Sequence, residues 1–206
     1  MPDIKLNFIN KSNDQNNSEI LIFQKNVTTG ASEIAVAWQV LKNLGQNWHH
    51  VVNYPSAVSV AAADEEGNAS DLHAAENGQT WSVIQTSSGH QVKYNGPAES
   101  PQCVEINNDL PQGAIEAQIY KDGKLLAVTQ GVHPGQKAVF EFKPTIWVGV
   151  ASEVSEGDVI DSAIISDINT EISLLGIASA DIVMTGGGSG QSATPFTFTL
   201  QNVVMA

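Results

Sequence analysis

The stretch 113–150 constrains the fold of this chain more than any other part, because apolar residues recur in it at every second position. In residues 115–120, isoleucine and alanine alternate with more polar side chains, which is typical of a strand with one buried face. Asp122-Gly123 follows, a pair that accepts the positive φ angles of a tight hairpin turn. The alternation returns in residues 137–143 and 145–150. The stretch therefore predicts a short antiparallel meander.

Short apolar runs separated by turn residues continue along the rest of the chain, and they predict roughly a dozen strands. Clear examples are residues 4–9 near the beginning and residues 196–201 near the end. Frequent turn signals between short strands are typical of β sandwiches and barrels. We therefore expect an all-β fold with little helix. Its architecture is expected to be an antiparallel two-sheet sandwich or, as the alternative, a barrel.

The domain organisation follows from length and from the absence of an obvious linker. A chain of 206 residues suits one large all-β domain, and we expect residues 1–206 to form it. The acidic stretch 151–158 is the alternative boundary. Residues 33–44 are ambiguous, because their apolar residues alternate as in a strand but also form a helical stripe. We favour the strand, because the surrounding sequence is β, and we expect the glycines of residues 186–190 to form a flexible connection.

Composition limits the partners and the compartment. The chain carries 9 basic residues against 22 acidic ones, a net charge of −13, and every basic residue is a lysine. An acidic surface without arginine repels nucleic acid, so no nucleic-acid partner is expected. No apolar run is long enough for a transmembrane helix, and no signal peptide is visible. We expect a cytoplasmic protein, or one released without a visible signal peptide. The single cysteine, Cys103, is expected to be a buried, inert thiol.

Aromatic and imidazole side chains supply the candidate binding residues. Trp48-His49-His50 is the most unusual local cluster, and Tyr54 follows shortly after it. Aromatic rings stack on sugars, and exposed rings on β scaffolds commonly make ligand contacts. The candidate ligand-binding residues are Trp48, His50, Tyr54, Trp81 and His133.

Metal binding and enzymatic activity are the competing interpretations of the polar residues. The histidines lack ligand-type spacing; they are His49, His50, His73, His90 and His133. Oxygen-bearing side chains around Gly67 resemble a calcium loop only loosely, and a solvated hairpin turn is favoured for Asp64, Glu66, Asn68 and Asp71. Four asparagine triplets match the N-glycosylation pattern, beginning at Asn10, Asn16, Asn26 and Asn68. We expect no metal and no cofactor.

The sequence as a whole predicts a soluble, acidic, non-enzymatic binding module that recognises a carbohydrate, a small molecule or a protein partner through loops at one end of a β sandwich. The first alternative is a metal-dependent enzyme that uses a subset of its histidines. The second is a structural or self-assembling protein, since residues 170–185 carry few charges that would guard a strand edge. A homo-oligomer is accordingly among the expected assemblies.

Overall fold

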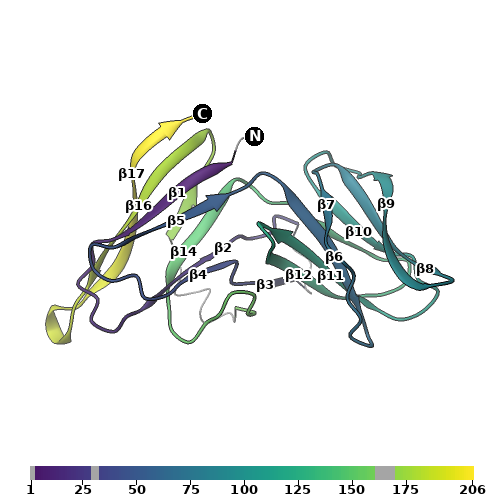
Figure 1. The fold of residues 1–206 in the computed structure, drawn as a ribbon, viewed down its shortest axis with the longest axis horizontal. Coiled ribbons are helices and arrows are strands. Elements are labelled where there is room, and N and C mark those ends of the chain that lie inside the picture. The colour runs from purple at the N-terminus through teal and green to yellow at the C-terminus, as the bar shows by residue number, and fades with distance from the viewer. Residues whose placement is uncertain (1–2, 29–32, 161–169) are drawn as a thin grey trace. The chain divides into compact units, whose positions relative to one another are not determined.

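A computed structural model describes residues 3–28, 33–160 and 170–206 of the chain (Figure 1). It divides into two compact units. The first unit comprises Met1–Gln24, Ala37–Ser56 and Pro144–Ala206, and the second comprises Lys25–Val36 and Ala57–Lys143. The number of independently folding domains is untested, so the expectation of a single domain stays a prediction. The alternative boundary at residues 151–158 lies inside the first unit.

The first unit contains two sheets. Its strands are β1 (Ile4–Asn10), β2 (Glu19–Phe23), β4 (Gln39–Leu41), β5 (His49–Tyr54), β14 (Thr145–Ala151), β15 (Thr170–Ser173), β16 (Ile177–Gly187) and β17 (Thr194–Met205). One sheet has the order β17-β16-β1-β5 and the other the order β15-β14-β2-β4. Strand β1 pairs in parallel with β16 and antiparallel with β5, so it joins the beginning of the chain to its C-terminal hairpin.

Burial in the first unit follows the alternation of the sequence. In β1, Ile4, Leu6 and Phe8 are buried, while Lys5 is exposed. A fully buried tryptophan, Trp38, packs edge-on against the buried ring of Tyr54, with the ring centroids 5.9 Å apart. Large rings of this kind contribute much of the apolar area that stabilises a core.

The second unit also contains two sheets. Its strands are β3 (Glu33–Ala35), β6 (Val58–Asp64), β7 (His73–Ala75), β8 (Gln79–Thr86), β9 (Gly89–Pro97), β10 (Val104–Asn108), β11 (Ile115–Lys121), β12 (Lys124–Val132) and β13 (Lys137–Phe140). The sheet orders are β13-β10-β8-β9 and β3-β12-β11-β6-β7. The core is built from buried residues of both sheets, among them Val60, Ile106, Ile119, Leu126 and Phe140.

The all-β, sandwich-like fold is confirmed, with two sheets in each unit. Each sheet ends in two edge strands, so the described residues form no closed barrel. The structure has more strands than the dozen expected, and parallel pairs make two of the sheets mixed. The only helical element among the described residues outside the strands is the short 3₁₀ helix η1 (Gly190–Ser192). No helix in the described part of the chain is long and apolar enough to cross a membrane.

The predicted meander is correct only in its first two strands. Strands β11 and β12 form the expected hairpin, and Asp122 and Gly123 adopt φ angles of 55° and 70° in its turn. Strand β13, however, pairs with β10, and β14 pairs with β2 and β15 in the first unit. Alternation indicates which face of a strand is buried, but it carries no information about which strand lies alongside.

Two other local predictions concern residues 33–44 and the glycines of residues 186–190. Residues 33–44 contain strands, as favoured, but β3 belongs to the second unit and β4 to the first. The glycines of residues 186–190 end β16 and begin η1 in the connection to β17, and the flexibility expected of them stays a prediction. The apolar pairs of residues 159–169 also predict a strand or one short helix, and most of that range, residues 161–169, lies outside the described residues.

Candidate functional site

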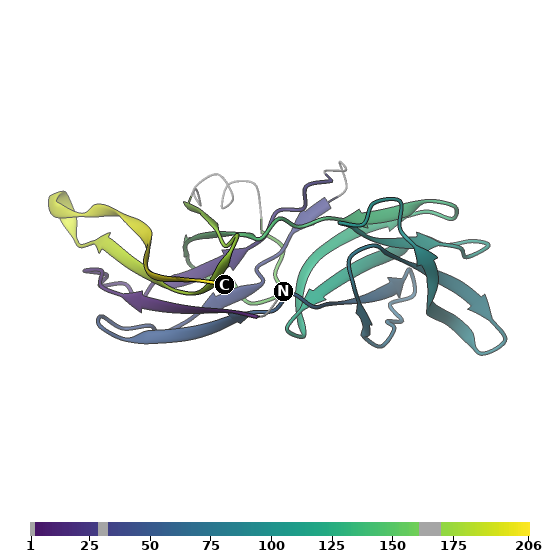
Figure 2. The same cartoon turned by 90° about the horizontal axis from the view of Figure 1, so that it is seen from above.

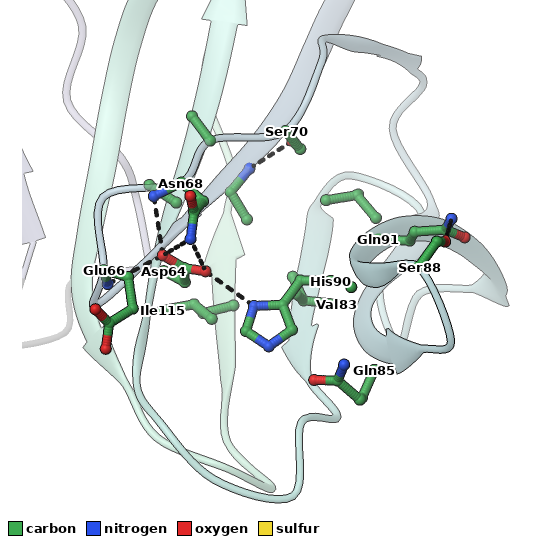
Figure 3. Close-up of a pocket in the computed structure, with 15 residues that line it drawn as sticks. Asp64, Glu66, Asn68, Ser70, Val83, Gln85, Ser88, His90, Gln91 and Ile115 are labelled. Carbon is green, nitrogen blue, oxygen red and sulfur yellow. Dashed lines mark hydrogen bonds and ion pairs between the residues drawn. The ribbon is translucent and has the colours of Figure 1, made fainter.

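A hollow of about 420 Å³ opens at one end of the second unit, between the β6–β7 turn and the β8–β9 hairpin (Figure 3). Because β6 and β8 belong to different sheets, the hollow lies where the two sheets of the sandwich diverge. Its apolar lining includes Ala62, Val83, Val92 and Ile115. Its polar lining includes Asp64, Glu66, Asn68, Ser70, Gln85, Ser88, His90 and Gln91.

The carboxylate of Asp64 organises one wall of the hollow. Its Oδ1 atom accepts the backbone N–H groups of Glu66 at 3.0 Å and of Asn68 at 2.9 Å. The side-chain amide of Asn68 donates to both carboxylate oxygens, at 3.2 and 3.0 Å. These bonds close the turn, in which Gly67 adopts a φ of 85° that suits glycine. Chiefly through the Asn68 amide, they hold the pKa of Asp64 below its usual value, so the side chain stays ionised at neutral pH.

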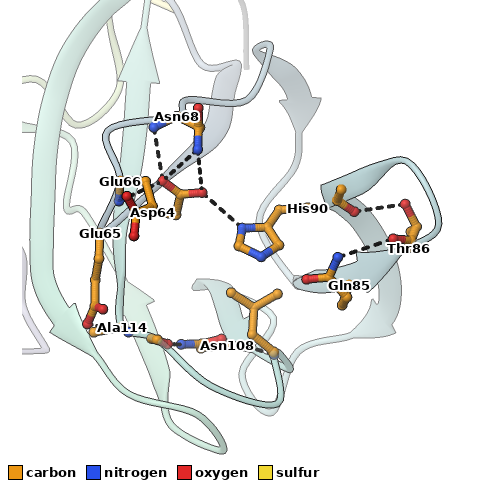
Figure 4. A network of polar contacts seen from close by, with 12 residues as sticks. Asp64, Glu65, Glu66, Asn68, Gln85, Thr86, His90, Asn108 and Ala114 are labelled. Atoms are coloured by element: carbon orange, nitrogen blue, oxygen red, sulfur yellow. Dashed lines mark hydrogen bonds and ion pairs between the residues drawn. The ribbon is translucent and has the colours of Figure 1, made fainter.

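His90 faces Asp64 from the opposite sheet (Figure 4). Its Nδ1 atom lies 3.0 Å from Asp64 Oδ2. An ionised carboxylate at Nδ1 fixes the ring orientation and favours the tautomer with the proton on Nδ1. The other ring nitrogen, Nε2, then points away from Asp64 and toward Gln85, the residue paired with His90 across the hairpin (Figure 3). His90 lines the hollow, and Nε2 is the ring nitrogen that does not contact Asp64.

The loop that follows β10 supports this site from below (Figure 4). Glu65 accepts the backbone N–H of Ala114 at 2.7 Å, which ties the β6–β7 turn to that loop. A second hollow, of about 460 Å³, is lined by residues 110–114 together with Asp64, Gln85 and His90. The Asp64–His90 pair thus borders both hollows.

An aromatic cluster lies on the face of the β8–β9 hairpin that carries Val83 and Val92. The cross-strand pair Trp81–Tyr94 precedes the pair Val83–Val92, whose side chains line the hollow. The Trp81 ring contacts His73 at a centroid distance of 5.6 Å and Tyr94 at 5.9 Å. Trp81 is only 9 % exposed, whereas Tyr94 is 57 % exposed. The indole N–H of Trp81 is buried and has no hydrogen-bond partner among the described residues, which is uncommon for a buried donor.

Among the described residues, the imidazole of His90 contacts the carboxylate of Asp64, and no serine, threonine or cysteine side chain is hydrogen-bonded to it. The hydroxyl of Ser88 instead contacts Thr86 and Gln91. Amide, carboxylate and imidazole groups around an apolar floor can pair with the hydroxyl groups of a polar ligand.

Comparison with known proteins places the chain in a family. A family model described as RhiA matches residues 2–185. The chain belongs to the RhiA family. No curated protein and no solved structure matches it. The matched range of this RhiA-family chain includes every residue of the hollow and ends before β17.

The structure does not gather the five sequence-predicted binding residues of the RhiA-family chain into one site. Trp48 is 68 % exposed in the turn before β5, and His50 is exposed within β5, both in the first unit. Tyr54 is buried in the core of that unit, where burial raises the pKa of its hydroxyl. Trp81 and His133 belong to the second unit, and only Trp81 lies beside the hollow. A ligand-binding role for these five residues stays a prediction.

Sequence reasoning missed Asp64 and His90 as partners. From the sequence, Asp64 is a residue of a favoured hairpin turn or a loose calcium-loop candidate. In the structure its carboxylate oxygens accept N–H donors of that turn. They also contact His90, which the turn did not predict. No group of three or more metal-ligating side chains is found among the residues that the structure describes. The two residues are 26 positions apart on different sheets, and no local signal connects them.

Two of the four glycosylation-like triplets, those at Asn10 and Asn26, bond their asparagine side chains to the backbone. The side-chain amide of Asn10 is buried and donates to the Leu44 carbonyl, and that of Asn26 donates to the Val139 carbonyl. The Oδ1 atom of each asparagine also accepts a hydrogen bond from the backbone N–H of the serine or threonine two positions later. The spacing that resembles a glycosylation site is here the spacing of a turn in which the side chain bonds the backbone.

Proposed function

We propose that this RhiA-family chain is a non-enzymatic binding module that holds a small polar ligand, with carbohydrate as the favoured class, in the hollow beside Asp64 and His90. The observation that carries the proposal is the convergence of polar side chains around this fixed pair, above an apolar floor. Small-molecule sites are commonly concave and apolar, with a few well-placed polar groups.

Carbohydrate is favoured over other polar ligands for two reasons. The hollow offers planar polar groups from Asn68, Gln85 and His90, which suit neighbouring hydroxyl groups. The exposed ring of Tyr94 and the ring of Trp81 lie beside it, and aromatic faces pack against the C–H groups of sugars.

The direct test is a screen of the wild-type chain against a glycan array, followed by titration calorimetry with the best ligands and with small polyols. Binding to at least one glycan class is expected. Complete lack of binding across the array and the polyols would sink the carbohydrate proposal.

Replacing His90 by alanine is expected to weaken binding of the best ligand by about tenfold or more, because the ligand loses a hydrogen bond and Asp64 loses its partner. Calorimetry of the wild-type and variant chains measures the change. The matched control is His133→Ala, which removes an exposed imidazole of the same unit that does not line the hollow. Equal affinity of wild type and a folded His90→Ala variant would contradict the role of the hollow.

The aromatic residues separate this site from the one predicted by sequence in the first unit. Tyr94→Ala is expected to lower glycan affinity by about threefold to about tenfold, because one stacking face is lost. Trp48→Ala, which removes the most exposed tryptophan side chain of the first unit, is expected to leave affinity unchanged. Intrinsic fluorescence and calorimetry measure both. The reverse pattern places the ligand beside β5 and refutes the site proposed here.

A further inference from the structure

Strand β17 is a long edge strand with one uncovered side. It spans Thr194–Met205 and stands at the end of the order β17-β16-β1-β5. On its inner side it pairs with β16. The pairing runs from Thr194, which lies opposite Gly187, to Met205, which lies opposite Ile177. No other strand of the described residues pairs with it, and Figures 1 and 2 show it as the outermost strand of that sheet. Its outer row of backbone N–H and C=O groups is thus available to a further strand.

The side chains of this strand lack the usual protection of a sheet edge. Residues 182–206 contain no aspartate, glutamate, lysine, arginine or histidine. Threonine, phenylalanine and valine dominate β17, and such residues favour strands. Near its end, Val204 is 54 % exposed and Met205 is 64 % exposed. Proteins commonly guard edges with charges, proline or bulges. Strand β17 has Pro195 at its second position and register irregularities on either side of residues 197–201, which pair regularly with β16 and carry no charge.

Charge indicates which occupant fits this edge. The chain has a net charge of −13, so most faces of two copies repel one another. The β17 edge is an uncharged surface on this acidic molecule, and two copies can approach there without placing carboxylates opposite each other. A two-fold axis between copies makes the two β17 strands antiparallel, which is the arrangement that pairs one strand with itself. We propose that β17 is a self-association strand, through which two copies of this chain join their sheets edge to edge.

This proposal is independent of the ligand-binding hollow, which lies in the other unit. Strand β17 also lies beyond the residues matched by the RhiA family model. Self-association is therefore a property of this chain's C-terminal hairpin and is not implied by membership of the family.

The test is sedimentation velocity of the full chain from about 1 µM to about 500 µM, where a weak dimer becomes populated. A concentration-dependent dimer is expected. The double variant Thr199→Lys with Val203→Lys places two cations on each strand, and it is expected to weaken dimerisation at least about 30-fold. The matched control is Asn53→Lys on β5, the exposed opposite edge of the same sheet, which is expected to dimerise like wild type.

Hydrogen exchange of the wild-type chain supplies a readout that needs no variant. Backbone amides of residues 194–205 are expected to exchange more slowly as protein concentration rises, while those of β5 stay unchanged. A monomer at every concentration overturns the proposal, as does a dimer whose β17 amides show no added protection. A folded double variant that dimerises as tightly as wild type also overturns it. A monomer that captures only a foreign strand contradicts the choice of a second copy.

Discussion

Replacing Lys121 by methionine is expected to lower the dependence of the free energy of unfolding on pH by up to about 1.4 kcal/mol per pH unit between about pH 7 and about pH 10. Lys121 is the last residue of β11 and is buried, and burial lowers the pKa of its ammonium group to about 7 from the ordinary 10.5. That difference corresponds to at most about 5 kcal/mol spent on burying the charged form. Methionine has a similar length and carries no charge, so it removes this cost without leaving a cavity.

The pH dependence of this effect has a definite sign. Between about pH 7 and pH 10.5 the unfolded chain keeps the Lys121 proton and the folded chain has released it. The unfolded state binds more protons in this interval, so the contribution of Lys121 to the free energy of unfolding rises with pH. Below about pH 7 both states are protonated and the full cost of burial is present. The stability of the methionine variant relative to wild type is therefore expected to fall as the pH rises from about 7 toward 10.5.

Urea denaturation of the wild-type and Lys121→Met chains at about pH 6, 8 and 10 measures this difference. The matched control is Lys93→Met, since Lys93 is an exposed lysine on a strand of the same unit. Its stability is expected to stay within about 0.5 kcal/mol of wild type at every pH. A Lys121→Met variant whose stability relative to wild type is the same at about pH 6 and about pH 10 refutes the argument.

The sequence was sufficient for the faces of strands and for local turns. Alternation identified the buried residues of β1 and β11, and Asp122-Gly123 identified a hairpin, because both signals lie within a few neighbouring residues. Strand partners were not predictable in the same way. Strand β13 looks like the continuation of a meander, yet it pairs with β10, because its pairing depends on residues about 30 positions away.

The candidate site was harder to predict for the same reason. Trp48 and Tyr54 are close in the sequence, which is why both are predicted ligand-binding residues. The Tyr54 side chain, however, is buried in the core. Asp64 and His90 are in contact only because the fold brings the turn after β6 next to the β8–β9 hairpin of the other sheet (Figure 3). Of the five ligand-binding residues predicted from the sequence, Trp81 is the one beside the proposed hollow. The sequence feature that led to its prediction was a large aromatic ring in a short strand.

Asn108→Ala is expected to lower the free energy of unfolding by about 3 to about 5 kcal/mol, because it leaves several buried backbone groups without partners. The Asn108 side chain is fully buried at the end of β10. Its amide donates to the carbonyls of Gly113 at 2.9 Å and Val132 at 2.8 Å, and its Oδ1 accepts the Leu110 N–H at 3.0 Å. Each buried group that loses its partner costs about 1 to 3 kcal/mol.

Two further variants sharpen this prediction. Asn108→Asp preserves the shape but turns an oxygen toward carbonyl groups, so it is expected to be at least as destabilising as Asn108→Ala near neutral pH. Asn77→Ala removes an exposed asparagine of the same unit and is expected to change stability by less than about 0.5 kcal/mol. Thermal and urea denaturation measure all three. Stability of Asn108→Ala equal to that of Asn77→Ala would show that the buried side chain does not hold these loops.

The same asparagine connects stability to binding. By bonding Gly113 and Leu110 it holds the loop whose next residue, Ala114, donates to Glu65 in the turn that carries Asp64 (Figure 4). Asn108→Ala is expected to loosen that loop and with it the Ala114–Glu65 hydrogen bond that holds the turn. The variant is therefore expected to weaken ligand binding as well as folding. His90→Ala, in contrast, is expected to weaken binding with little loss of stability, since His90 is partly exposed. This contrast distinguishes a residue that positions the hollow from one that contacts its ligand.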